Sequence, residues 1–213
     1  PLTLIFDPAL AYFANNGYNH TLIQNMIILS QSEISRLMSR IRLPQKRLMV
    51  ALAYGAGLRA KEVVNLRAKN LDLEKGLMQM KDRTTMLPKK LKIELWQAAQ
   101  NKAPEAFLFA REGGIPFSPR TAQILFRRAL RRAKILKPAT FRSLRDSFAV
   151  HLLENGMDIH HVQKHLGNRK ISTTRGYKKW VTKDPLKMAD PLEQMLWLNE
   201  YRREQAGRVD SWT

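Results

Sequence analysis

The hydrophobic pattern of this chain changes its period along the sequence, and the change restricts the folds that the chain can adopt. Apolar residues recur at the spacing of an α-helix in most of the chain, namely in residues 28–41, 46–57, 60–73, 91–102, 120–136, 143–155, 158–166 and 170–180. Residues 71–88 instead alternate loosely between apolar and polar side chains. The sequence therefore predicts a mainly α, α+β fold with one small antiparallel β-sheet of two or three short strands. A further strand is expected at residues 107–110.

The net charge of the chain indicates a polyanionic partner. Its 213 residues include 37 Lys and Arg against 18 Asp and Glu, which gives a net charge of +19. Nucleic acid explains this surplus best, and an anionic membrane surface is the second candidate. Apolar residues make up 44% of the chain, which is enough to bury a sizeable core, so the sequence is not that of a disordered basic tail.

Other features exclude several classes of protein. The chain contains no cysteine, so disulfides, thiolate metal sites and cysteine nucleophiles are ruled out. Its longest apolar run, residues 48–58, is far shorter than the roughly 20 residues that cross a bilayer. The first ten residues lack the basic and apolar regions of a secretion signal. We therefore expect a cytoplasmic protein with no membrane partner.

The sequence supports neither a nucleotide site nor a metal site. No Gly-x-Gly-x-x-Gly segment follows a strand, and no Gly-rich loop ends in Lys-Ser or Lys-Thr. His161 and His165 have a spacing that suits zinc, but no acidic ligand lies in register, so we interpret them as surface or packing histidines. The acidic residues are few and scattered, which argues against paired carboxylates that hold two metals. We expect no metal and no cofactor.

One segment concentrates the positive charge. Residues 120–145 contain nine basic side chains and no acidic one. A basic helix can simply be a solvated surface, but such surfaces usually carry interleaved acids. The pattern therefore favours a phosphate-binding face. The expected DNA-binding residues are Arg120, Arg127, Arg128, Arg131, Arg132 and Lys134.

Two arginines and a tyrosine could carry out chemistry on a phosphodiester without a metal. Such a reaction needs cations that stabilise the transition state and a hydroxyl that attacks in line. Arg59 follows a Gly-containing helix end, Arg145 lies near the start of an expected helix, and Tyr177 lies in Thr-Thr-Arg-Gly-Tyr. Singly, these residues could be a helix cap, a surface cation and a core aromatic. Their order along the chain changes that interpretation.

These residues resemble the tyrosine recombinase (phage integrase) family. Residues 51–73 resemble its first arginine box, in which a helix ends at Gly-x-Gly-Leu-Arg, here with Arg59, and a Glu follows, here Glu62. Residues 137–177 resemble its second box, with Arg145 as the second arginine and Tyr177 as the nucleophile. The sequences of residues 28–37, 81–88 and 137–140 are similar to those of integron-type and related bacterial integrases. The resemblance covers roughly residues 28–190.

The resemblance has consequences for fold and activity. It implies the family's catalytic-domain fold, and strand exchange on duplex DNA through a 3′-phosphotyrosyl intermediate. It implies DNA integration and recombination without metal or ATP. It also implies a protein that is encoded by a mobile element and acts on DNA as a dimer or tetramer. It also implies a bacterial, nucleoid-associated location. Glu62 would orient the arginine region through hydrogen bonds.

The chain departs from the family pattern at three supporting positions. The family's His-x-Leu-Arg has Arg142 in place of His, and the later His or Trp position is Asn168. The strand hairpin that carries the catalytic lysine is shortened, and Lys81 is the best remaining candidate to protonate the leaving group. A guanidinium stays protonated near pH 7, so Arg142 cannot accept a proton. Losing a general acid or base typically costs about 10²- to 10⁴-fold in rate.

Three functional readings therefore stay open. The first is an active recombinase, and the second is a catalytically impaired relative that binds DNA as a decayed integrase or regulator. The third is a type IB topoisomerase-like enzyme that uses the same residues without partner choice. We expect residues 28–183 to form the catalytic domain, after a short segment at 1–27. Residues 184–213 would form a tail with a helix that docks on a neighbouring protomer.

Overall fold

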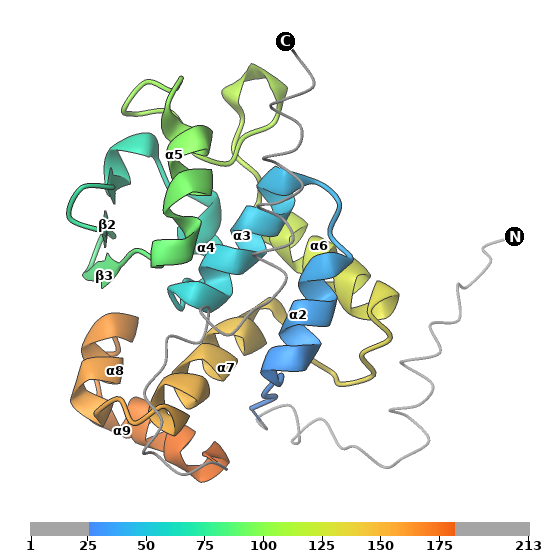
Figure 1. Cartoon of the computed structure of the whole chain (residues 1–213), viewed down its shortest axis with the longest axis vertical. Helices are drawn as coiled ribbons and strands as arrows, with labels where there is room; N and C mark the ends of the chain where they lie inside the picture. The colour runs from blue at the N-terminus through green and yellow to red at the C-terminus, as the bar shows by residue number, and fades with distance from the viewer. Residues whose placement is uncertain (1–25, 182–213) are drawn as a thin grey trace, which may run out of the picture.

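The described part of the chain covers residues 26–181 of a computed structural model (Figure 1). Its α-helices are α2 (Gln31–Ser39), α3 (Pro44–Gly55), α4 (Ala60–Val64), α5 (Lys92–Ala99), α6 (Pro119–Arg132), α7 (Phe141–Glu154), α8 (Ile159–Leu166) and α9 (Ile171–Arg175). Its strands are β1 (Leu71–Asp72), β2 (Leu77–Gln79) and β3 (Thr84–Met86). Short 3-10 helices are η2 (Ala68–Asn70), η3 (Lys89–Leu91), η4 (Glu112–Gly114) and η5 (Gly176–Trp180). The predicted mainly helical α+β architecture is confirmed.

The first helices begin where the sequence supplies caps. Ser30 is the N-cap of α2, and its hydroxyl accepts from the Glu33 amide while the Glu33 carboxylate accepts from the Ser30 amide, at 3.2 and 2.8 Å. This reciprocal arrangement satisfies two amides that a helix start leaves free. Pro44 is the first residue of α3, where the missing N–H of proline costs nothing.

The three strands form one antiparallel sheet in the order β1-β2-β3. Met78 of β2 pairs with Leu71 on one side and with Thr85 on the other. Both Met78 and Thr85 are buried, which holds the sheet against the helical core. Figure 1 shows β2 and β3 beside α5, with α8 below them.

Three sequence predictions about elements were wrong. The helix expected at 60–73 ends at Val64, because the chain turns at Asn65 and enters the sheet at Leu71. The strand expected at 107–110 makes only isolated bridges, from Phe107 to Arg67 and from Ala110 to Pro116. The single helix expected at 170–180 divides into α9 and η5, because the hydrogen bonds tighten from Gly176 onward.

The core centres on α3 and α7, which pack against each other. Every residue of α7 except Arg142 is buried, so this helix passes through the middle of the domain. Gly57 follows α3 with a φ of +61°, and a Cβ atom there would lie 2.8 Å from both Leu166 and Phe148. Only glycine fits this close approach, which brings the α3–α4 link against α7 and α8.

No helix in residues 26–181 has the length and apolar character needed to cross a membrane. The segments expected at residues 1–27 and 184–213, including the docking helix, lie almost wholly outside the described residues.

Candidate active site

A pocket of about 590 Å³ gathers most of the residues that the sequence singled out for chemistry. Its lining includes Arg59, Arg142, Arg145, Asn168 and Tyr177, which come from α4, α7 and the segments after α8. The remaining lining residues are Ala60, Gln123, Arg127, Ala139, Thr140, Phe141 and Thr173. Positions more than one hundred residues apart in the sequence therefore share one cavity.

Arg145 is buried and held rigidly. Its guanidinium donates to the carbonyl oxygens of Gly57 and Leu166, at 2.7 and 2.8 Å, and to Asn168 Oδ1 at 2.9 Å. These bonds use three of its five N–H donors, so two remain for a ligand. Burial, with repulsion from Arg59 and Arg83, lowers the pKa of Arg145 to about 10. The guanidinium therefore remains cationic at neutral pH, and the surrounding positive charges would stabilise a bound anion.

Asn168 links Arg145 to α9. Its Oδ1 accepts from Arg145, and its Nδ2 donates to the buried Thr174 hydroxyl at 3.1 Å. The preceding Gly167 caps α8 in the left-handed conformation, with φ 67° and ψ 39°. Asn168 thus holds the second arginine and the start of the tyrosine segment in a fixed relation.

Arg59 lies at the pocket mouth, at the N-cap position of α4. Glu62 accepts from the Arg59 amide at 2.6 Å and from the Arg59 guanidinium at 3.3 Å. The same carboxylate forms a two-point ion pair with the buried Arg83, which also donates to the His165 carbonyl oxygen at 3.1 Å. Burial raises the pKa of Glu62, but the bonds from Arg83 and Arg59 outweigh it and hold the pKa below its usual value.

The tyrosine hydroxyl points at a carboxylate. Tyr177 is buried, and its hydroxyl donates to Asp146 Oδ1 at 2.9 Å. The other carboxylate oxygen of Asp146 lies 3.5 Å from Arg142 Nε. Burial, together with the Asp146 charge, raises the pKa of Tyr177 to about 12, and burial raises the pKa of Asp146. Arg142 is otherwise largely exposed at the pocket.

Lys81 does not join this group. It is exposed on the turn between β2 and β3, and it is not among the described residues that line the pocket. The turn instead sends Arg83 inward, to Glu62 and to the end of α8.

The two histidines with zinc-like spacing do not form a metal site. His161 is exposed beside Asp158, whereas His165 is mostly buried, contacts the Thr85 hydroxyl at 3.1 Å and packs against Phe148. Burial, with repulsion from Arg83 and Arg145, lowers the pKa of His165 to about 4. Within residues 26–181, no group of three or more His, Asp or Glu side chains could hold a metal ion.

The basic helix predicted from the sequence is α6. Its inward face is apolar, with Ala122, Phe126 and Ala129 buried. Arg127 lines the active-site pocket, while Arg128 and Arg132 line a separate groove of about 370 Å³. Arg120, Arg131 and Lys134 are exposed outside both hollows.

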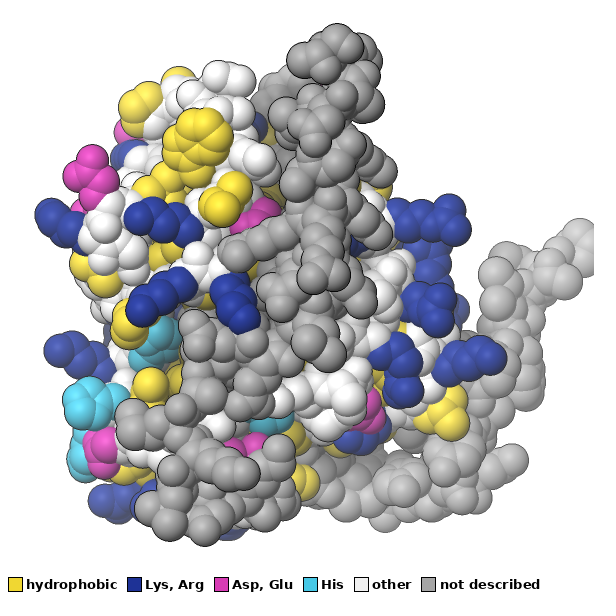
Figure 2. Space-filling view, in the orientation of Figure 1, with side chains coloured by type: hydrophobic (Ala, Val, Ile, Leu, Met, Phe, Trp, Pro, Cys, Tyr) yellow, Lys and Arg dark blue, Asp and Glu magenta, His cyan; other side chains and the backbone are white. Residues whose placement is uncertain are grey.

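Arg40, Arg42 and Lys46, from the start of α3 and the link before it, line the same groove as Arg128 and Arg132. Figure 2 shows Lys and Arg side chains gathered on the side of the molecule where Figure 1 places α2 and α6. The positive charge therefore extends from α6 onto the neighbouring α2–α3 link.

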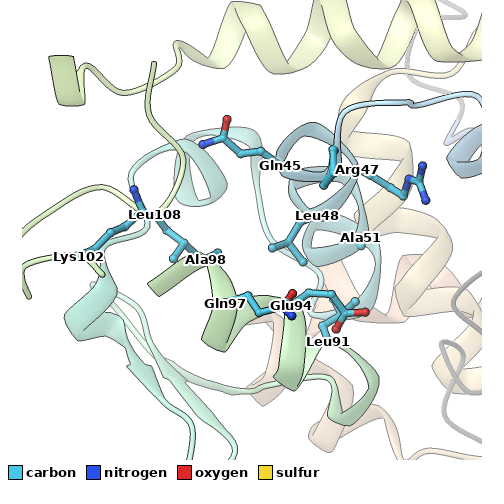
Figure 3. A pocket seen from close by; sticks show the side chains of 11 residues that line it. Gln45, Arg47, Leu48, Ala51, Leu91, Glu94, Gln97, Ala98, Lys102 and Leu108 are labelled. Atoms are coloured by element: carbon cyan, nitrogen blue, oxygen red, sulfur yellow. The ribbon is translucent and has the colours of Figure 1, made fainter. Parts of the chain in front are cut away.

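Another hollow, of about 310 Å³, lies between α3 and α5 (Figure 3). Leu48 and Ala51 of α3 face Leu91 of η3 and the α5 side chains Glu94, Gln97 and Ala98 across it. It shares no lining residue with the arginine-rich pocket, so it is a separate feature of the fold.

The phage integrase family model matches residues 28–182, which is most of the chain. The chain belongs to the phage integrase family. The tyrosine recombinase XerA of Thermococcus kodakarensis is 36% identical over 180 residues, which cover 79% of this chain and 63% of that protein. The XerA of Pyrococcus furiosus is 30% identical over 219 residues, which cover 92% of this chain and 76% of that protein. The chain thus spans less than two thirds of the first of these relatives.

Solved structures of phage integrase family members share the fold. A crystal structure of XerA recombinase aligns with a TM-score of 0.66 at 24% identity, over 87% of this chain and 70% of that one. The post-cleavage complex of XerH recombinase with its palindromic difH substrate aligns with a TM-score of 0.64 at 22% identity, over 78% and 53%. These similarities confirm the predicted catalytic-domain fold.

Sequence analysis overlooked two site residues of this phage integrase family member. Asp146 follows the second arginine directly and could have been noticed as the first acid after Glu112, at the end of 33 acid-free residues. Arg83, in the shortened hairpin, is the buried partner of Glu62. Neither contact has a local sequence signal, because the partners are 31 and 21 residues apart.

Proposed function

We propose that this chain cleaves and rejoins duplex DNA as a site-specific recombinase, with Tyr177 as the nucleophile. The observation that carries the proposal is the shared pocket, in which the Tyr177 side chain and four arginines surround one hollow. A phosphodiester is an anion whose charge on the non-bridging oxygens grows during attack, and guanidinium groups stabilise that charge. Relatives named as tyrosine recombinases add support to this assignment.

The residues have distinct proposed roles. Tyr177 attacks the phosphorus and forms the 3′-phosphotyrosyl intermediate. Arg145 and Arg59 bind the non-bridging oxygens, and Arg142 adds a third cation at the pocket rim. Asn168 and Glu62 hold Arg145 and Arg59 in place through the hydrogen bonds described above. Lys81 would protonate the leaving 5′-oxygen after the β2–β3 turn moves toward the pocket.

The proposed ligand is double-stranded DNA bound along α6. Arg127 lines the pocket, and Arg128 and Arg132 of the same helix line the separate basic groove, so phosphates beyond the scissile one would meet cations. Neighbouring structures that contain recombinases with DNA substrates favour the same partner. On DNA, we expect the chain to act as a dimer or tetramer.

The test is covalent capture of the tyrosine. Nicked suicide duplexes, tiled across the DNA that flanks the gene, are incubated with the protein and analysed on a denaturing gel. We expect an adduct that resists denaturation with the unaltered chain and none with Tyr177→Phe. Gel-shift binding without an adduct would contradict the recombinase, and an adduct formed by Tyr177→Phe would contradict the nucleophile.

A second candidate function is a DNA-binding relative that has lost cleavage. It is favoured by Arg142, where the family has His, by Asn168, where the family has His or Trp, and by an exposed Lys81 outside the pocket. The same experiment separates the two functions, because this candidate predicts normal gel-shift binding with no adduct. Relaxation of supercoiled DNA that carries no special site would instead indicate a topoisomerase-like activity.

A further inference from the structure

The proposed cleavage leaves one chemical requirement without an assigned residue. The phenol of Tyr177 must lose its proton as its oxygen bonds to phosphorus, so a group within hydrogen-bond distance must accept that proton. Arg142 cannot do so, because a guanidinium has no acceptor atom at neutral pH. Asn168 cannot either, because an amide is not basic and its side chain already bonds to Arg145 and Thr174.

Asp146 is placed where the acceptor must be. Its Oδ1 accepts a 2.9 Å hydrogen bond from the Tyr177 hydroxyl, and both side chains are almost fully buried. Asp146 belongs to α7, the same buried helix that carries Arg142 and Arg145. Packing of this helix in the core holds the carboxylate beside the tyrosine. The tyrosine itself comes from η5, which packs against α7.

We propose that Asp146 is a catalytic residue that accepts the proton of Tyr177 during strand cleavage and returns it during rejoining. This inference rests on the proposed recombinase function. In cleavage, the Tyr177 Oη–phosphorus bond forms as the phosphorus–O5′ bond breaks, and the Oη proton moves to Asp146 Oδ1. The O5′ atom leaves with the electron pair of its broken bond and takes a proton from the leaving-group donor, for which Lys81 is proposed.

Rejoining is the reverse of these movements. A 5′-hydroxyl attacks the phosphotyrosine and gives its proton to the leaving-group donor, which lost one during cleavage. The phosphorus–Oη bond breaks, and Asp146 returns the stored proton to the tyrosine oxygen. The surrounding charges suit a carboxylate that must alternate between two states. Burial raises the pKa of Asp146, whereas the hydrogen bond from Tyr177 of η5 and the charges of Arg142 and Arg145 of α7 lower it. Burial prevails and raises that pKa, which strengthens the carboxylate as a base.

The variant Asp146→Asn separates proton transfer from geometry. Asparagine has nearly the same shape and can still accept the Tyr177 hydrogen bond, but it cannot take the proton. With suicide duplexes in excess, we expect the rate of adduct formation to fall by about 10²- to 10⁴-fold while gel-shift affinity does not weaken. Asp146→Glu, which keeps a carboxylate, should recover part of the rate. Asp72→Asn, a change at a half-buried residue of β1 outside the pocket, is the matched control and should leave the rate unchanged.

The pH profile of the unaltered chain gives a second test that needs no variant. If Asp146 is the acceptor, the cleavage rate falls at acid pH, from a higher pH than a surface aspartate would give, and is level above it. The Asp146→Asn variant should lose this acid limb and instead gain rate about tenfold per pH unit, because solvent must then remove the proton. The same steep rise in the unaltered chain would overturn the proposal.

The outcomes also distinguish this inference from the proposed function. An adduct that forms at the same rate, or faster, in Asp146→Asn would overturn the role of Asp146 while leaving the recombinase intact. A faster rate would mean that Asp146 restrains the tyrosine instead of activating it. If the unaltered chain binds DNA but forms no adduct on any duplex, the cleavage function fails, and the role of Asp146 fails with it.

Discussion

Individual side chains in this site differ in how their charge is compensated. Arg83 meets a carboxylate directly in its ion pair with Glu62, whereas Arg145 is held by two backbone carbonyls and one amide. Carbonyl dipoles fix the orientation of a guanidinium without neutralising it. The positive charge of Arg145 is therefore not neutralised and can bind an anionic ligand. Arg83 mainly links Glu62 to the end of α8.

Replacing Arg145 by lysine should therefore impair cleavage more than its retained charge suggests. A lysine ammonium cannot reach Gly57, Leu166 and Asn168 in one plane, so their oxygens lose a donor and the phosphate loses a planar partner. We expect adduct formation to fall at least about 10²-fold. Arg36→Lys, on the exposed surface of α2, serves as the control, and an Arg145→Lys rate within about twofold of the original would contradict the assignment.

Replacing Glu62 by glutamine should destabilise the fold, because Arg83 would keep its charge in a buried site without a carboxylate. We expect the free energy of unfolding in urea to fall by about 3 kcal/mol. Lys75→Gln removes an exposed pair with Asp72 and should cost less than about 1 kcal/mol. Equal losses in the two variants would contradict the structural role of the Glu62–Arg83 pair.

The pH dependence of stability should carry the signature of His165. Its pKa is about 4 in the folded chain and 6.5 when unfolded, so below pH 6.5 the unfolded state binds a proton that the folded state does not. Stability from this group is therefore complete above pH 6.5 and declines as the pH falls toward 4. Between pH 7 and 5 we expect a loss of about 2 kcal/mol in urea unfolding.

The variant His165→Gln should remove that part of the decline, because glutamine has no proton to gain in this range. His161→Gln, which changes an exposed histidine on the same helix, should leave the decline in place. If both variants show the same pH dependence as the unaltered chain, His165 does not control it.

The chemistry-bearing residues were predictable from the sequence to a definite depth. Arg59, Arg145 and Tyr177 lie in sequence motifs that follow one another in the order typical of the family, so they could be named without a structure. The bond from Tyr177 to Asp146 could not, because it depends on how η5 returns to α7. Lys81 illustrates the same difficulty, since a shortened hairpin decides which of its cations faces inward, and here that cation is Arg83.

The secondary structure elements bring these side chains together. The C-terminal end of α8, at Gly167, has little space for a side chain. Gly167 adopts a left-handed conformation there, and a Cβ atom at this position would overlap the Arg83 side chain. Gly76, in the β1–β2 turn, also has a positive φ of 66°, but nothing lies within 4 Å of its missing Cβ. The two glycines share a left-handed backbone conformation and differ in their surroundings.

Changing both glycines to alanine in turn should separate those two effects. Gly76→Ala should cost only the left-handed strain, about 1 kcal/mol in urea unfolding. Gly167→Ala should cost at least about 1 kcal/mol more, since Arg83 must leave Glu62 to make room. It should also slow adduct formation, whereas Gly76→Ala should not. Equal costs would show that the contact with Arg83 is unimportant.

The elements themselves were predicted where their pattern is local. Apolar periodicity predicts α6 and α7, and the capping Ser30 and Glu33 of α2 are neighbours in the sequence. The strand wrongly expected near Phe107 and the early end of α4 are connected. The chain leaves the helix so that Arg67 can bridge to Phe107, and a contact across 40 residues leaves no periodic signal.

The charge of the whole molecule should appear in the salt dependence of DNA binding. If Arg128 and Arg132 each contact a phosphate, replacing both by glutamine should make the slope of log K against log salt shallower by about 2. Replacing Lys75 in the β1–β2 turn and Lys92 of α5 by glutamine removes the same charge elsewhere and should change the slope little. Equal changes in slope would mean that the net charge, and not the α6 groove, guides binding.

The Tyr177 hydroxyl, its Asp146 partner and the arginines that would hold the phosphate all belong to one chain and open into one pocket. Genetic complementation between subunits should therefore fail. A mixture of Tyr177→Phe with Arg145→Lys protein would contain no subunit with a complete set, and assembled on DNA it should cut no faster than either variant alone. In an assembly of this protein, each copy would act on its own strand, and the number of cuts would count the intact subunits.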